Sequence, residues 1–205
     1  MKLGLLADIH EDVERLELAI ARLRALGAER FVMLGDVFDR GDAGRLDAVA
    51  ALLDGVGAAG VWGNHDYGLS VDPGDLERRR YTPRTLDCMA RLCARLEIDG
   101  CLFSHIEPRL DPNRLEDLWD CGEHPDTPGR VDANFAAAPQ RLMVMGHNHR
   151  WILARPGEVL AWEGECPVRL DPPSRYLVVV HAVADGWCAM LDTGAHLLTP
   201  VNLEG

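Results

Sequence analysis

The 205-residue sequence is poor in positive charge. It has 21 Lys and Arg residues against 33 Asp and Glu residues, so the formal net charge is −12 when His is taken as neutral. Proteins that hold nucleic acids or anionic membranes through phosphate contacts usually present a basic surface. The composition therefore argues against both partners, and any phosphate group bound by this chain must be held by something other than an excess of basic side chains.

The sequence also lacks a long hydrophobic run. The N-terminal apolar stretch ends already at Asp8, which makes it too short for a signal peptide or a membrane span. The longest later run, residues 177–180, is typical of a buried strand. We therefore expect a cytoplasmic protein without a membrane segment.

Cysteine shows no disulfide or metal-binding pattern, because none of the six cysteines forms a C-x-x-C pair. A chain of this length buries roughly 70% of its unfolded surface and does not need a disulfide framework. We expect reduced thiols. The length is typical of one domain, and no linker interrupts residues 1–205.

Short apolar runs recur five times, each followed by polar residues. The runs are KLGLLA, RFVML, AGVW, CLF and RLMVM. Apolar runs without alternation are typical of strands that are covered on both faces. Residues 12–26 and, more weakly, 44–54 have the apolar spacing of helices, and Gly27 is a helix stop signal. This order predicts an α/β fold.

Three of the polar positions are evenly spaced. Asp8, Asp36 and Asn64 are 28 residues apart, which is close to the length of one strand–helix–strand unit. Because α/β sheets carry their sites at the carboxyl ends of strands, we expect these polar residues to converge at one edge of a sheet.

The remaining segments are less regular. We expect a loop after residue 66, a helix over 83–96, and a hairpin with its turn at Asp99-Gly100. Residues 106–140 are rich in Pro, Asp and Glu, which predicts a long insertion with one short helix near Asn134. From Trp151 onward the pattern indicates antiparallel strands.

The polar clusters contain five of the eight histidines. They comprise Asp8 to His10, Gly35 to Gly41, Gly63 to Asp66, His105, and Gly146 to His149. Carboxylate, imidazole and carboxamide groups suit Mn, Fe, Zn or Co, and the absence of cysteine from the clusters argues against a structural thiolate site. Each motif alone is weak evidence, but five of them at strand ends indicate a catalytic metal site.

The order D-x-H, G-D-x-x-D, G-N-H-D, isolated His and G-H-x-H resembles the calcineurin-like metallophosphoesterase superfamily. The resemblance spans residues 8–149 and implies a β-sandwich flanked by helices with two divalent metal ions. Manganese is the favoured metal, with Fe, Zn, Co or Ni as alternatives. The resemblance assigns Asp8, His10, Asp36 and His149 to the first ion, and Asn64, His105, His147 and the shared Asp36 to the second.

The same resemblance implies hydrolysis of a phosphate ester by a hydroxide that both ions activate. It assigns His65 as the general acid for the leaving group and Asp39 as its orienting carboxylate. The block G-D-V-F-D-R-G is similar to that of protein-phosphatase-like members, in which the arginine, here Arg40, contacts the substrate phosphate. Members specialised for phosphodiesters often have another residue at the position of His65, so the resemblance favours phosphomonoesters as substrates. A small phosphate ester is the expected substrate, and the alternative substrates are a phosphoprotein, a phosphodiester or a dinucleoside polyphosphate. An alternative function is that of a binding scaffold without catalytic activity.

Several residues depart from the family pattern or admit two interpretations. Glu11 follows D-x-H where protein-phosphatase-like members usually have Gly, and Asp66 stands where they usually have Glu. Trp62 and Trp119 could stack on a base or sugar, or simply pack. The run of arginines over 78–80 is a candidate phosphate contact or a solvated charged segment.

Overall fold

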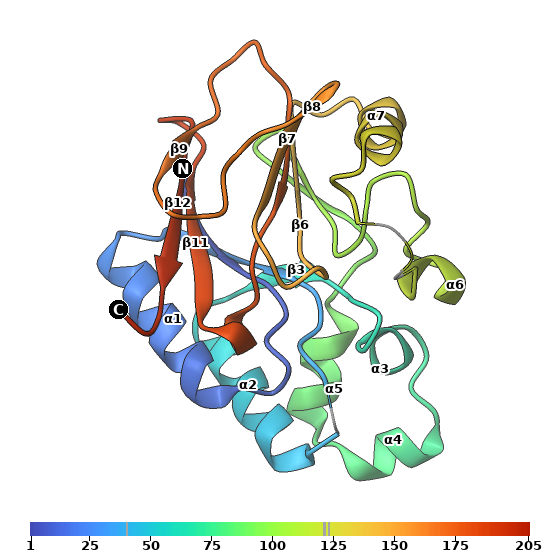
Figure 1. Ribbon diagram of the computed structural model, residues 1–205. Helices are drawn as coiled ribbons and strands as arrows, with labels where there is room; N and C mark the ends of the chain where they lie inside the picture. The colour runs from blue at the N-terminus through green and yellow to red at the C-terminus, as the bar shows by residue number, and fades with distance from the viewer. Residues whose placement is uncertain (40, 121, 123) are drawn as a thin grey trace.

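The computed structural model describes residues 1–39, 41–120, 122 and 124–205, and it contains two sheets flanked by helices (Figure 1). The strands are β1 (Lys2–Leu6), β2 (Arg30–Leu34), β3 (Ala59–Val61), β4 (Leu96–Ile98), β5 (Cys101–Phe103), β6 (Leu142–Met145), β7 (Ile152–Arg155), β8 (Glu158–Val159), β9 (Val168–Arg169), β10 (Tyr176–Val179), β11 (Trp187–Asp192) and β12 (Leu197–Asn202). The helices are α1 (Val13–Ala25), α2 (Ala43–Gly55), α3 (Tyr67–Val71), α4 (Asp75–Arg80), α5 (Pro83–Ala90), α6 (Leu115–Leu118), α7 (Pro128–Ala137) and the short 3₁₀ helix η1 (Val183–Asp185).

Each sheet mixes parallel and antiparallel strands. In the described residues the first sheet has the order β3-β2-β1-β11-β12-β9, and the second has the order β4-β5-β6-β10-β7-β8. Strands β1, β2 and β3 run parallel to one another, as do β5, β6 and β10. The predicted helix-flanked β-sandwich is confirmed.

The strands read as continuous apolar runs because both faces of each sheet are covered. In β1, Leu3 and Leu5 point into the core between the sheets, whereas Leu6 packs under helices α1 and α2. In β6, Val144 lies in the core between the sheets, and Met145 packs on the other face with side chains of α7. The result is a helix–sheet–sheet–helix arrangement in which the core between the sheets is closed to water.

The two helices predicted from apolar spacing are confirmed. Helix α1 begins after Asp12, whose carboxylate accepts a hydrogen bond from the backbone N–H of Arg15, and ends before Gly27, which has a φ of +88°. Helix α2 begins after Asp42, which caps it in the same way. Side-chain capping of this kind satisfies N–H groups that have no partner within the helix.

Three expectations for the middle of the chain are corrected. The helix expected over 83–96 ends at Ala90, because the chain then runs beside β3 and Cys93 exchanges backbone hydrogen bonds with Gly60 and Trp62. The expected loop after residue 66 contains α3 and α4, and the insertion over 106–140 contains α6 as well as the helix around Asn134. The hairpin at Asp99-Gly100 and the antiparallel C-terminal strands are confirmed.

Two further observations concern helices and thiols. None of the helices in the described ranges is both long and apolar enough to cross a membrane. The cysteines within the same ranges are free thiols.

Candidate metal centre

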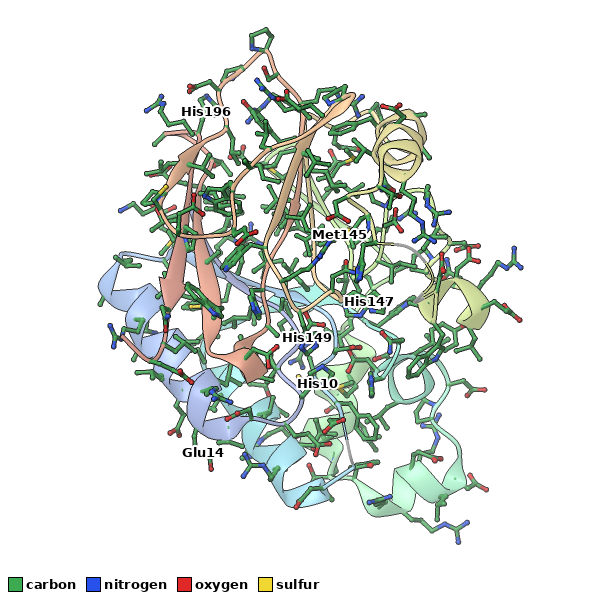
Figure 2. All side chains as sticks on the ribbon, viewed as in Figure 1. His10, Glu14, Met145, His147, His149 and His196 are labelled. Carbon is green, nitrogen blue, oxygen red and sulfur yellow. The ribbon has the colours of Figure 1, made fainter. Side chains whose placement is uncertain are left out.

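The polar clusters meet at one end of the sandwich. They follow β1, β2 and β3 in the first sheet and β5 and β6 in the second, so that the ends of strands from both sheets contribute. The convergence of Asp8, Asp36 and Asn64 at one edge of a sheet, expected from their spacing, is confirmed, and the second sheet adds His105, His147 and His149. Figure 2 shows His10, His147 and His149 close together at this end, and together with their neighbours they form the ligand cluster described next.

The first half of the ligand cluster contains Asp8, His10 and His149, with Asp36 beside it. The Nε2 atoms of His10 and His149 lie 3.1 Å apart. His149 Nε2 is 3.8 Å from Asp8 Oδ1, and His10 Nε2 is 4.0 Å from Asp36 Oδ2. These atoms are close enough to surround one ion.

The second half contains Asn64, His105 and His147, again with Asp36. The Oδ1 atom of Asn64 lies 3.0 Å from His105 Nε2 and 3.1 Å from His147 Nδ1. Asp36 Oδ2 is 3.4 Å from His105 Nε2. Asp36 thus contacts both halves, and the structure brings together all seven residues predicted as ligands.

The spacing and tautomers of these side chains fit metal ligation. Ligand atoms about 2.1 Å from a common ion lie roughly 3 Å from each other, which matches the His10–His149 contact. His105 Nδ1 donates to the carbonyl oxygen of Leu34 at 2.7 Å, and His149 Nδ1 donates to Asp185 Oδ2 at 2.7 Å. Each hydrogen bond keeps a proton on Nδ1 and turns Nε2 toward the cluster, so that Nε2 is the atom that would bind an ion.

The charges of the cluster also fit a cation site. Burial raises the pKa of Asp8 to about 7. Burial also disfavours the charged forms of Asp36 and His105, but the attraction between these two groups is stronger. It lowers the pKa of Asp36 and raises the pKa of His105 to about 9. Burial and the neighbouring His105 lower the pKa of His147 to about 4. In the described part of the chain, the cationic partners of Asp8 and Asp36 are histidines alone, so divalent ions would supply the missing positive charge.

The backbone at the cluster is strained. Six of the eight non-glycine residues with positive φ in the described chain lie here: Asp8, His10, Glu11, Asp36, His147 and His149. Such conformations cost about 1–3 kcal/mol each and persist only where surrounding contacts enforce them. The positions of the ligands are therefore fixed by the fold rather than by local backbone preference.

Two buried carboxylates, Glu11 and Asp66, supply some of those contacts, and both stand where protein-phosphatase-like sequences usually have another residue. Glu11 accepts hydrogen bonds from the backbone N–H groups of Gly41 (3.0 Å) and Asp39 (3.3 Å). Asp66 accepts from Phe38 and Gly63, each at 2.9 Å. Glu11 holds the loop after β2, and Asp66 joins that loop to the one after β3.

His65 lies beside the ligand cluster. Its backbone N–H donates to Asp36 Oδ1 at 3.1 Å, and its ring centroid is 5.1 Å from that of His10. Asp39 lines a cavity of about 620 Å³ together with His10, and Arg80 from α4 lines the same cavity. Arg40 lies outside the described residues, so its predicted phosphate contact stays a prediction.

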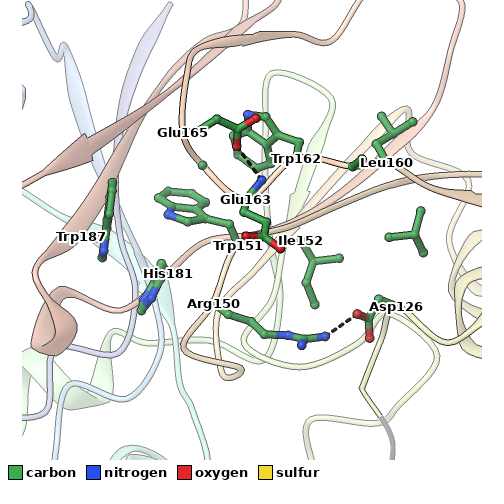
Figure 3. Close-up of a pocket in the computed structure, with 13 residues that line it drawn as sticks. Asp126, Arg150, Trp151, Ile152, Leu160, Trp162, Glu163, Glu165, His181 and Trp187 are labelled. Carbon is green, nitrogen blue, oxygen red and sulfur yellow. Dashed lines mark hydrogen bonds and ion pairs between the residues drawn. The ribbon is translucent and has the colours of Figure 1, made fainter.

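A larger cavity of about 880 Å³ is lined in part by the residues that directly follow His149 in the sequence (Figure 3). Its wall includes Trp151 and Trp187, together with Arg150, which is paired with Asp126. His181 also lines it, and His181 Nδ1 is 3.9 Å from the Asp185 carboxylate that holds His149. The cavity is therefore connected to the ligand cluster through His181 and Asp185.

The sequence did not identify Asp185 as a residue of the site, and it left two interpretations of Trp62 and Trp119, stacking on a ligand or packing in the fold. Asp185 precedes Gly186, a pair that is typical of a turn, and nothing local links it to His149, which is 36 residues away. Trp62 packs against Tyr67 and donates its Nε1–H to the carbonyl oxygen of Pro112. Trp119 is 51% exposed, and its ring centroid lies 5.2 Å from that of His65.

Comparison with known proteins agrees with this geometry. The model of the calcineurin-like phosphoesterase superfamily domain matches residues 1–182. The crystal structure of a metallophosphoesterase from Sphaerobacter thermophilus is similar with a TM-score of 0.77 and 20% identity, covering 98% of this chain and 88% of that one. An archaeal phosphodiesterase (TM-score 0.57, 98% and 99% covered) and the protein TT1561 of Thermus thermophilus (0.58, 98% and 98%) are each 14% identical. No curated protein sequence matches the chain.

Proposed function

The chain belongs to the calcineurin-like phosphoesterase superfamily and is a phosphoesterase hydrolase, and we propose that it cleaves phosphomonoesters with His65 as the general acid. The observation that carries this proposal is an imidazole beside the ligand cluster that is part of neither set of four ligands. The donor atoms of His65, His10 and Asp36 lie within 4.8 Å of one another. A proton donor at this distance can reach an ester oxygen next to the ions.

Asp8, His10, Asp36 and His149 would hold one divalent ion, and Asn64, His105, His147 and Asp36 would hold the other. Bound there, the two ions would supply an activated water and a positive charge for the phosphoryl oxygens. We favour Mn²⁺ because the donor set consists of oxygen and imidazole nitrogen atoms.

The protein side chains set the geometry of the reaction. Glu11 and Asp66 fix the loops that carry Asp36, Asp39 and His65, because they accept hydrogen bonds from backbone N–H groups of both loops. His65 delivers its proton to the leaving oxygen, and we assign to Asp39 the role of orienting that imidazole. Positions fixed in advance lower the entropic barrier to reaction.

We propose a small phosphate ester as the substrate. The charge of −12 disfavours long polyanions over the surface as a whole. Two divalent ions would return four of those charges at a single place, where Asp8 and Asp36 lie buried. A single phosphate group can therefore bind at a site that a nucleic acid would approach poorly.

Replacing His65 with Ala should reduce hydrolysis of an alkyl phosphomonoester by about 10²- to 10⁴-fold, because the alkoxide then leaves without a proton. Hydrolysis of a nitrophenyl ester should fall much less, since nitrophenolate is a good leaving group. Steady-state kinetics with Mn²⁺ on both esters, and on the matching nitrophenyl diester, measures the difference.

Equal losses on the alkyl and nitrophenyl esters would contradict the assignment of His65 as the acid. Turnover of the diester with none of either monoester would contradict the proposed substrate class. His124 is exposed and is a matched control: His124→Ala should leave the rates on both esters unchanged.

A further inference from the structure

We propose that Trp119 binds the leaving group of the substrate and selects esters whose leaving group carries a flat aromatic ring. This inference rests on the proposed function, since it uses His65 to locate the leaving group. It is carried by an exposed indole in contact with His65: the two ring centroids are 5.2 Å apart, and the ring planes are inclined by 51°. Large aromatic side chains are usually buried, so 51% exposure beside a reacting centre calls for an explanation.

The position of His65 defines where the leaving group lies. The general acid must come within hydrogen-bond distance of the leaving oxygen, about 2.6–3.2 Å. The carbon skeleton bonded to that oxygen then starts next to the imidazole. Two aromatic rings of the described chain contact His65: the ligand His10, with a centroid distance of 5.1 Å, and Trp119. Because His10 belongs to the ligand cluster, the indole is the ring within reach of a group attached to the leaving oxygen.

Residues on both sides of Trp119 hold it in place. Before it, Leu118 is fully buried against Ile106 and Leu110. After it, the Oδ2 atom of Asp120 accepts hydrogen bonds from Arg109 (3.1 Å) and Arg130 (3.0 Å). A side chain whose backbone is already ordered loses less entropy when a ligand binds.

The two arginines are themselves anchored by a buried acid. Glu107 is 4% exposed, and its carboxylate accepts hydrogen bonds from Arg130 (2.6 Å) and Asn134 (2.6 Å) as well as from Arg109. This network ties α7 to the segment that carries Trp119. The charges near the indole are thereby paired with one another.

A second exposed apolar side chain lies close to Trp119 in α6. Leu115 lies one helical turn before Trp119, is also 51% exposed, and accepts a hydrogen bond from the Trp119 backbone N–H. Residues four apart in a helix lie on the same side, so leucine and indole form one apolar surface. Stacking on an aromatic side chain stabilises a flat ring more than it stabilises an alkyl chain.

The test compares phenethyl phosphate with ethyl phosphate, which share a primary alcohol as leaving group and differ by one ring. Trp119→Ala should lower the ratio of their kcat/KM values about ten-fold. Trp119→Phe, which keeps a flat ring, should retain most of the preference, whereas Trp119→Leu, which is apolar but not flat, should lose most of it. Leu76→Ala removes a 71% exposed apolar side chain on α4 and should leave the ratio and both rates unchanged.

Binding provides a readout that does not depend on turnover. Calorimetry of phenethylphosphonate and ethylphosphonate with the Mn²⁺-loaded protein should show a parallel loss of discrimination, about ten-fold, in Trp119→Ala. A parallel fall of both substrates, with the ratio unchanged, would overturn the proposal and assign Trp119 to packing against His65. Absence of turnover of any ester by the wild type would instead refute the proposed function, while the phosphonate pair would still decide the role of Trp119.

Discussion

Replacing Asp36 with Asn should reduce phosphoesterase activity by about 10³-fold and leave fewer than two Mn²⁺ ions bound per chain. Asp36 contacts both halves of the ligand cluster, through His10 at 4.0 Å and His105 at 3.4 Å. The amide has nearly the same shape but lacks the negative charge, so ion stabilisation of several kcal/mol is lost. A barrier higher by about 4 kcal/mol corresponds to this factor.

The variant should still fold. Asn can keep the Oδ1 acceptor for the backbone N–H of His65, which Asp36 uses at 3.1 Å. It also places no charge at a site that is only 3% exposed. Circular dichroism and thermal unfolding check the fold, and bound manganese is measured by elemental analysis after gel filtration. Asp54→Asn, on the exposed side of α2, is the matched control; activity of Asp36→Asn close to that of Asp54→Asn would contradict the shared-ligand role.

Replacing Gly63 with Ala should remove most metal binding and lower activity by at least about 10²-fold, although Gly63 has no functional group. A Cβ atom at this position would lie 2.0 Å from Asp36 Oδ1 and 2.6 Å from the Asp36 backbone nitrogen. The second contact is with backbone, so a rotamer change of Asp36 cannot relieve it. The loop after β2 must move, and the shared ligand moves with it.

The expected loss of stability in Gly63→Ala is about 1–3 kcal/mol, as for other overpacked sites. Calorimetric metal titration and urea unfolding separate the two effects. Gly68→Ala is the matched control, because a Cβ atom at residue 68 would meet nothing within 4 Å. Wild-type metal affinity in Gly63→Ala would show that close packing between the two loops does not position Asp36.

The sequence was sufficient to predict those parts of the molecule that depend on local pattern. Helices α1 and α2 follow from apolar spacing and capping aspartates, and strands β1, β2 and β6 follow from apolar runs. The predicted metal ligands followed from motifs at strand ends together with a family resemblance. These signals lie within a few residues of one another along the chain.

Features that depend on contacts distant in sequence could not be predicted. The pairing of Cys93 beside β3 ends α5 early, and no property of residues 83–96 signals it. Asp185 reaches His149 because η1 is held at the end of β1, where Val183 donates to the carbonyl oxygen of Ala7. The place of Trp119 likewise depends on anchors at Leu118 and Asp120. Glu11 appeared as a departure from a motif, whereas the fold uses it to hold a loop.

The most direct test of the dinuclear assignment is a metal titration of chelator-treated protein in which bound Mn²⁺ and hydrolysis of a phosphomonoester are followed in the same samples. The metal-free protein should be inactive, and activity should rise to a plateau at two ions per chain. Turnover without metal, or a plateau reached at one ion in protein with all seven assigned ligands intact, would contradict the account.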